Sequence, residues 1–162
     1  MLVERNRLQI TNPVVLKEQE TKIIKEKFKI LNKSLLFGEQ TLELDYLRKL
    51  HLFLFEDIYY SSDLSIRREY SEQDLLNING LLQNIIFLAE EKNIDPSYLK
   101  DVIYNLWSIQ LFRDGNNRTL WAYLKVFIDY YDLPLELQPF KEESYGHFNI
   151  SQKHPKNSYI KN

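Results

Sequence analysis

The chain has 162 residues, 27% of them charged and 44% hydrophobic, with 21 lysines and arginines against 23 aspartates and glutamates. A single domain around one core is expected at this length. The formal net charge of −2 disfavours nucleic acid as a partner, because nucleic-acid-binding proteins usually carry a basic surplus on one face. The absence of cysteine excludes disulfides and thiolate zinc sites, and it fits a reducing cytoplasm. The three histidines are too scattered to indicate a metal cluster.

Long helices should dominate the fold, because only four glycines and five prolines interrupt the chain. Apolar residues recur at three- and four-residue steps in five segments, the pattern of helices with one buried face. The predicted helices are residues 16–35, residues 42–58, a third opened by Ser71 and Asp74, a fourth opened by Asp95 and Pro96, and a fifth after residue 117. No apolar run is long enough to span a bilayer, so we expect no membrane partner and a cytoplasmic location.

Two segments show no helical period. Residues 59–70 contain a turn-prone Ser-Ser-Asp centre, which is equally compatible with a short exposed hairpin and with an irregular loop. Residues from about 141 onwards mix Ser, Asn, Lys and Pro with few apolar anchors, so we expect this end of the chain to be partly flexible.

The loop between the fourth and fifth helices carries the residues best suited to chemistry. Free N–H groups at the start of a helix, preceded by residues that tolerate left-handed backbone, form a concave anion site. Gly115, Asn116 and Asn117 provide that backbone, Arg118 adds a planar cation, and Asp114 could hold a magnesium ion. Spacing alone is also compatible with an ordinary turn between two helices, in which these residues serve only the backbone.

At this loop the chain resembles the Fic (Fic/Doc) family, whose signature is His-Pro-Phe-x-Asp/Glu-Gly-Asn-Gly-Arg-x-x-Arg. Five specific positions of the signature match, namely Phe112, Asp114, Gly115, Asn116 and Arg118. Upstream, residues 50–59 followed by Ile66 and Arg67 resemble the family's helix leading into its target-docking flap. Together these matches cover about residues 40 to 135.

The resemblance implies an all-α fold, a Fic-like helical bundle with a short β-hairpin flap. Its parts would be an N-terminal segment (1–40) with a surface helix on the core, a Fic-like core (41–135) and a C-terminal extension (136–162). It implies binding of Mg²⁺ and ATP and transfer of AMP to a hydroxyl of a target protein. Asp114 would then hold the metal, Phe112 would anchor the loop, and the phosphate-binding residues would be Arg113, Gly115, Asn116, Asn117 and Arg118. The flap residues that dock the target would be Ser62, Asp63, Leu64, Ser65 and Ile66.

Three of the chain's departures from the family pattern bear on function. Gln110 occupies the place of the catalytic histidine, and a carboxamide is no general base near neutral pH. Trp121 replaces the last arginine, which contacts the terminal phosphates in the family, and Asn117 replaces the second glycine. The matched region contains one histidine, His51. It lies among leucines and is expected to be a packed structural residue. No segment matches the family's inhibitory helix, Ser/Thr-x-x-x-Glu-Gly/Asn, although a separate antitoxin-like chain could supply one.

Three hypotheses follow for the function. The first is a degenerate Fic domain, a pseudoenzyme or weak adenylyltransferase that keeps a nucleotide- or phosphate-binding loop. The second is an active transferase or toxin with non-standard chemistry, in which Gln110 only positions the acceptor hydroxyl. The third is a non-catalytic protein-interaction module. The first is preferred, with a target protein docked at the flap and an antitoxin-like inhibitory chain as expected partners.

Overall fold

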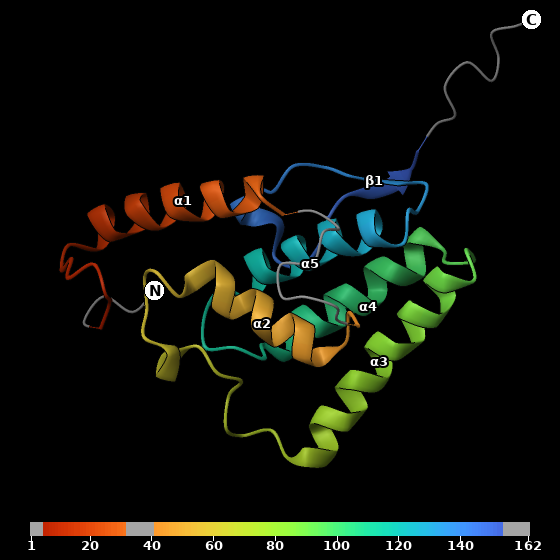
Figure 1. Ribbon diagram of the computed structural model, residues 1–162, viewed down its shortest axis with the longest axis horizontal. Helices are drawn as coiled ribbons and strands as arrows, with labels where there is room; N and C mark the ends of the chain where they lie inside the picture. Colours follow the sequence, from red (N-terminus) through yellow and green to blue (C-terminus); the bar gives the residue numbers. More distant parts are fainter. Residues whose placement is uncertain (1–4, 32–40, 154–162) are drawn as a thin grey trace, which may run out of the picture.

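The computed structural model describes residues 5–31 and 41–153, and it is mostly helical with a small two-stranded antiparallel sheet (Figure 1). This confirms the predicted helical bundle. The helices are α1 (Pro13–Lys29), α2 (Leu44–Phe55), α3 (Glu72–Glu90), α4 (Pro96–Ile109) and α5 (Asn116–Tyr130), with short 3₁₀ turns η1 (Ser61–Asp63) and η2 (Glu142–Ser144). The strands are β1 (Leu135–Leu137) and β2 (Ile150–Gln152).

Local sequence signals explain where the helices begin. The Ser71 hydroxyl accepts from the Asp74 amide, and the Asp74 carboxylate accepts from the Ser71 amide, so the predicted capping box forms. The Asp95 carboxylate accepts from the Ser97 amide and Pro96 starts α4, also as predicted. α1 begins three residues earlier than expected, because the Asn12 side chain caps it ahead of Pro13. Predicted helical residues 32–35 lie outside the described residues.

Helix α5 is the central element of the bundle. It lies beside α2 and α4, while α1 and α3 lie on opposite sides of the molecule (Figure 1). Most of its residues are buried, including Asn116, Arg118 and Thr119 in its first turn, which lies next to the expected phosphate loop. The packing of α5 therefore holds the start of this helix rigidly in the middle of the molecule. Within the described ranges, no helix has both the length and the apolar character needed to cross a bilayer.

The flap segment does not form the hairpin that was one of its two expected forms. Residues 61–63 form the single turn η1, and the backbone of residues 66 and 67 pairs with residues 111 and 112, between α4 and α5. Ile66 forms an isolated antiparallel bridge with Phe112, and the Arg67 amide donates to the Leu111 carbonyl at 2.9 Å. Because these backbone groups are satisfied by residues 111 and 112, the flap does not pair with itself. The two-stranded antiparallel sheet of the fold is formed instead by β1 and β2, with Leu135 opposite Gln152.

Part of the expected C-terminal extension is folded. β1 and β2 pair, η2 lies between them in the chain, and Phe148 and Ile150 are buried in the core. The remaining residues of the extension, 154–162, lie outside the described residues. The turn between the strands places residues 142–146 against the start of α5, so this segment takes part in the site described below.

Replacing Gly80 with alanine is expected to raise the free energy of unfolding by about 0.5 to 1 kcal/mol. Gly80 lies inside α3, and a Cβ at this position would meet no atom within 4 Å. The substitution should therefore add helix propensity without a steric cost. Urea denaturation of both proteins measures the difference, and an unchanged or lowered stability would show that the surroundings of Gly80 are more crowded than the structure shows.

Candidate functional site

The motif loop, residues 112–118, turns sharply into α5 at Gly115. Gly115 is the N-cap of the helix with φ 81°, in the left-handed region, and a Cβ there would lie 2.4 Å from the Phe55 ring. Both the backbone angle and the close approach therefore require glycine. The amides of Asn116, Asn117 and Arg118 belong to the first turn of α5, where a helix offers no intrahelical acceptor. The loop thus presents the N–H groups and the positive dipole end that bind anions.

Asn116 shapes the loop rather than reaching toward a ligand. It is buried, its Oδ1 accepts from the Phe112 amide at 3.0 Å, and its Nδ2 donates to the Phe112 carbonyl at 2.8 Å. The same Nδ2 donates to Oε1 of Gln110 at 3.2 Å. The side chain of Asn116 therefore closes the loop from inside, while its backbone amide remains part of the helix start.

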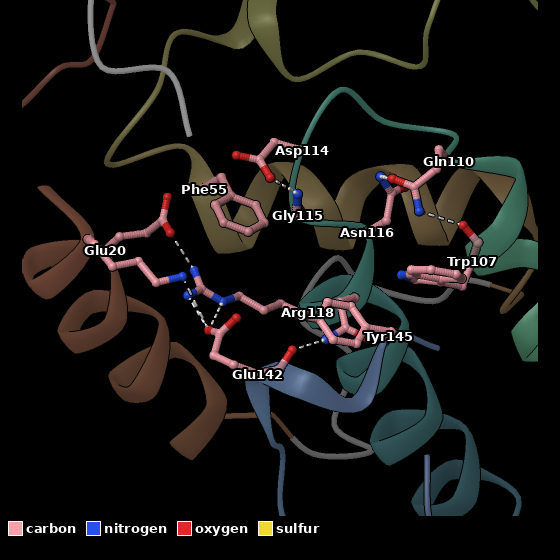
Figure 2. Close-up of a pocket in the computed structure, with 12 residues that line it drawn as sticks. Glu20, Phe55, Trp107, Gln110, Asp114, Gly115, Asn116, Arg118, Glu142 and Tyr145 are labelled. Carbon is pink, nitrogen blue, oxygen red and sulfur yellow. Dashed lines mark hydrogen bonds and ion pairs between the residues drawn. The ribbon is translucent and has the colours of Figure 1, made fainter. Parts of the chain in front are cut away.

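Gln110 lies at the mouth of the site with both ends of its carboxamide in use. It ends α4 in a left-handed conformation, and its Nε2 donates to the Trp107 carbonyl at 2.7 Å while its Oε1 accepts from Asn116 (Figure 2). The Gln110 carbonyl accepts from the Arg67 guanidinium at 2.9 Å. These bonds hold the side chain in place as a structural amide, and a neutral amide cannot take a proton from an acceptor hydroxyl.

The two charged residues before Gly115 lie apart. Asp114 is exposed at the rim of the site, and its Oδ1 accepts from the Gly115 amide at 2.9 Å. Arg113, predicted to bind phosphate, points away to Asp63 in η1 at 3.4 Å and does not line the cavity. Among the described residues, no group of three histidine, aspartate or glutamate side chains could hold a metal. Asp114 is thus a candidate ligand for a cation that is also bound by phosphate oxygens.

Arg118 is held by two carboxylates from distant parts of the chain, an arrangement named the Arg118 clamp below. Its Nη1 donates to Oε1 of Glu20 in α1 at 2.7 Å, and its Nε and Nη2 donate to Oε2 of Glu142 in η2 at 3.1 and 2.5 Å (Figure 2). Arg118 and Glu20 are buried, and the Tyr59 hydroxyl donates to the second oxygen of Glu20. Burial by itself would lower the pKa of Arg118, but the hydrogen bonds and charges of Glu142 and Glu20 raise it above its ordinary value. The guanidinium is therefore present but already paired.

Asn117 connects the start of α5 to the turn at 142–146. Its Nδ2 donates to the Glu142 carbonyl at 3.1 Å, and its Oδ1 accepts from the Ser144 hydroxyl at 3.2 Å and the Gly146 amide at 2.9 Å. A glycine, the family's residue here, could make none of these side-chain bonds. The side chain of Asn117 therefore fixes the turn at 142–146 to the start of α5.

These residues surround a cavity of about 310 Å³, called the first cavity here. Backbone and polar groups of the motif loop form one part of its wall, and the Arg118 clamp with Lys17 closes one end. Aromatic rings form the other end, where Trp107 and Tyr145 lie 6.3 Å apart between ring centroids (Figure 2). The amides at the start of α5 and flat apolar rings thus share one cavity, as a ligand with an anionic and an aromatic part would require.

Trp121, at the position of the family's last arginine, is a core residue and does not line the first cavity. Its ring packs 4.7 Å from that of Phe28 in α1, and its Nε1 donates to the Gln138 carbonyl at 3.0 Å. The indole therefore holds α1 and the segment after β1 against α5. A second phosphate-binding cation is absent from this position.

His51 is a structural residue, as the sequence predicted. It is 1% exposed, its ring stacks on Phe112 at 3.8 Å, and its Nε2 lies 2.8 Å from the Asp114 carbonyl. Its Nδ1 lies 3.2 Å from the Leu64 carbonyl, so the ring joins the flap to the motif loop. Burial lowers the pKa of His51 to about 4, even though both carbonyls favour the charged form. The neutral ring positions the loop and has no access to the first cavity.

Stability should fall on mild acidification because of His51. The pKa of His51 is about 4 in the folded chain and 6.5, its ordinary value, in the unfolded chain. As the pH falls, the unfolded chain therefore binds the proton before the folded chain does. The contribution of neutral His51 is fully present above about pH 6.5 and is lost toward pH 4. Between pH values of about 7.5 and 5 we expect a loss of about 2 kcal/mol, measured by urea denaturation. His51→Gln is the control, and an equally steep pH dependence in that variant would contradict the assignment.

The expected flap residues lie beside the motif loop. Leu64 is buried, Ile66 is half-buried, and Ser62 and Ser65 are exposed. Asp63 faces two guanidinium groups, those of Arg5 and Arg113, each at 3.4 Å. The flap residues thus lie beside the motif loop, and their predicted role in docking a target stays a prediction. The sequence contained no signal for Glu20, Glu142, Trp107 or Tyr145, which reach the site from other elements.

A comparison with solved structures finds similar folds, among them a bacterial effector protein. The crystal structure of BepC, a VirB-translocated effector protein of Bartonella tribocorum with bound AMPPNP, superposes with a TM-score of 0.64. The two chains are 14% identical over 83% of this chain and 75% of the other. No protein-family model and no curated protein sequence matches the chain. The structural likeness supports the Fic-like helical fold predicted from the motif.

Proposed function

We propose that this chain is a Fic-like protein that binds a nucleotide through the motif loop and has weak or lost adenylyltransferase activity. The observation that carries this proposal is the left-handed turn at Gly115, which aims the first amides of α5 into a cavity with an aromatic wall. The ATP analogue in the structurally similar BepC supports a nucleotide as the ligand. A phosphate would accept from the amides of residues 116–118, and a base would stack beside Trp107 and Tyr145.

The residues present fit a phosphate group, but they fit a triphosphate less well. The first cavity, at about 310 Å³, lies at the lower end of the usual size of ligand pockets. Glu20 and Glu142 already accept from the Arg118 guanidinium, so it is not available to further phosphates. Binding of ATP would require Glu142, the more exposed of the two carboxylates, to leave the guanidinium. Mg²⁺ bound by Asp114 and by phosphate oxygens would offset the negative charge of the nucleotide.

Weak catalysis follows from the positions of Gln110 and His51. Gln110 is tied to Trp107 and Asn116, and His51 is buried behind the loop, so neither supplies a general base to the first cavity. The missing proton transfer is worth about a hundred- to ten-thousand-fold in rate. The flap, residues 62–66, would still dock a target protein through its exposed edge. An antitoxin-like chain, if one binds, would compete with the carboxylates of the Arg118 clamp.

The test combines calorimetry with a transfer assay. We expect AMPPNP with Mg²⁺ to bind the natural chain, and the transfer of AMP from α-labelled ATP to protein to remain near background. In Gln110→His we expect transfer or pyrophosphate release to rise by about a hundred-fold, the lower end of the effect of a positioned base. Gln138→His, which adds a histidine outside the first cavity, is the matched control.

Each alternative has its own outcome. Transfer by the natural chain that Gln110→His does not increase would favour an active transferase with non-standard chemistry. No binding of ATP, ADP or AMP at millimolar concentration would favour a non-catalytic interaction module.

A further inference from the structure

A second cavity, of about 500 Å³, lies between α1 and the segment after β1. It is separate from the first cavity, and Arg118 and Glu142 contribute to the walls of both. Of the residues that bind phosphate or the target in the proposed function, only Arg118 also lines the second cavity. The volume is within the usual range for small-molecule sites.

Three aromatic rings line this cavity. The Phe28 ring lies 4.7 Å from that of Trp121 and 5.6 Å from that of Phe140, and the rings of Trp121 and Phe140 are 6.0 Å apart. Because the Trp121 Nε1 already donates to the Gln138 carbonyl, the indole presents apolar surface to the cavity without an unmet hydrogen bond. Such a cluster of tilted and edge-on rings favours another flat aromatic group as its ligand.

Two lysines of α1 line the same cavity. Lys25 and Lys29 are exposed and lie one helical turn apart, with Thr21 one turn before them. Like charges four residues apart disfavour a helix, and Glu26, at 2.9 Å from Lys29, balances only part of this charge. An anion between the two ammonium groups would remove the repulsion and gain charge-assisted hydrogen bonds.

We propose that the second cavity binds a small aromatic carboxylate, with its ring among Phe28, Trp121 and Phe140 and its carboxylate between Lys25 and Lys29. The charge of the two lysines selects an anion, and the three rings select a flat apolar body. This site is independent of the nucleotide proposed for the first cavity. Its test therefore succeeds or fails whether or not the first cavity binds a nucleotide.

Calorimetric titration of the full chain with 1-naphthaleneacetate and with the neutral 1-naphthaleneacetamide tests this proposal. We expect the carboxylate to bind about ten-fold more tightly than the amide, the gain of one charge-assisted hydrogen bond. In the double variant Lys25→Gln, Lys29→Gln this preference should fall to about two-fold or less, because both cations are gone. Lys22→Gln, a substitution on α1 outside the cavity, should leave the preference unchanged. Phe140→Ser should weaken both probes.

Circular dichroism and thermal unfolding check that the variants fold. If Phe140→Ser does not fold, the variants of the two exposed lysines still test the charge preference. Equal affinity for the two probes, or no heat with either at millimolar concentration, would overturn the proposal. It would also be overturned by a charge preference that survives the double lysine variant, since the carboxylate would then bind elsewhere.

Discussion

Replacing Arg118 with methionine is expected to lower the free energy of unfolding by about 3 to 5 kcal/mol, because it leaves Glu20 buried without its cation. Arg118 and Glu20 each have a side chain only 6% exposed, and their 2.7 Å hydrogen bond joins α1 to α5. Urea denaturation measures the loss. The exposed pair of Lys17 and Glu142, at 3.6 Å, provides the matched control: Lys17→Met should cost about 1 kcal/mol or less.

A double-mutant cycle separates the pair from its surroundings. Adding Glu20→Gln to Arg118→Met should recover a substantial part of the lost stability, since the buried charge is then removed along with its partner. Additive losses in the cycle would show that the two side chains contribute independently, and the Arg118 clamp would not be the contact that fixes α1 on the site.

Replacing Gly115 with alanine is expected to cost about 2 to 4 kcal/mol and to displace the motif loop. The new Cβ would lie 2.4 Å from the Phe55 ring, and alanine disfavours the observed φ of 81° by about 1 kcal/mol or more. The remainder comes from moving a buried ring. Phe55→Leu combined with Gly115→Ala relieves the clash but keeps the backbone strain, so it should recover part of the loss.

Denaturation curves of these variants distinguish the two causes. A Gly115→Ala protein as stable as the natural chain would show that the motif loop adopts another conformation and that Gly115 is not in the left-handed turn at the start of α5. Gly80→Ala, at a glycine without either constraint, is the matched control, because its expected effect has the opposite sign.

The elements of the fold that could be predicted are those with local signals. The capping box at Ser71, the Asp95 cap before Pro96 and the apolar spacing of each helix depend on residues a few positions apart, and the structure confirms them. The Asn12 cap before Pro13 is a local signal of the same kind, and it starts α1 three residues earlier than the apolar spacing alone predicts. The motif loop was predictable because its residues are consecutive and its conformation follows from Gly115.

The remainder of the site depends on contacts between residues far apart in the chain. Glu20 pairs with Arg118 across 98 positions of the chain and Glu142 across 24, and no sequence pattern distinguishes either from the other glutamates of the chain. The turn at 142–146 also looked irregular in sequence, because its order comes from the bonds to Asn117 and not from its own composition. The sequence has no inhibitory-helix motif, and nothing else in it indicates that Glu20 of α1 pairs with Arg118 of the motif loop.

In the proposed function, the amides at the start of α5 form the phosphate site. The most direct measurement is the ¹H–¹⁵N NMR spectrum of the natural chain during titration with AMPPNP and Mg²⁺. We expect the largest shifts at the backbone amides of Asn116, Asn117 and Arg118 and at the Trp107 indole, and little change at the Trp121 indole. Unchanged amide signals at these positions, at millimolar nucleotide, would contradict it.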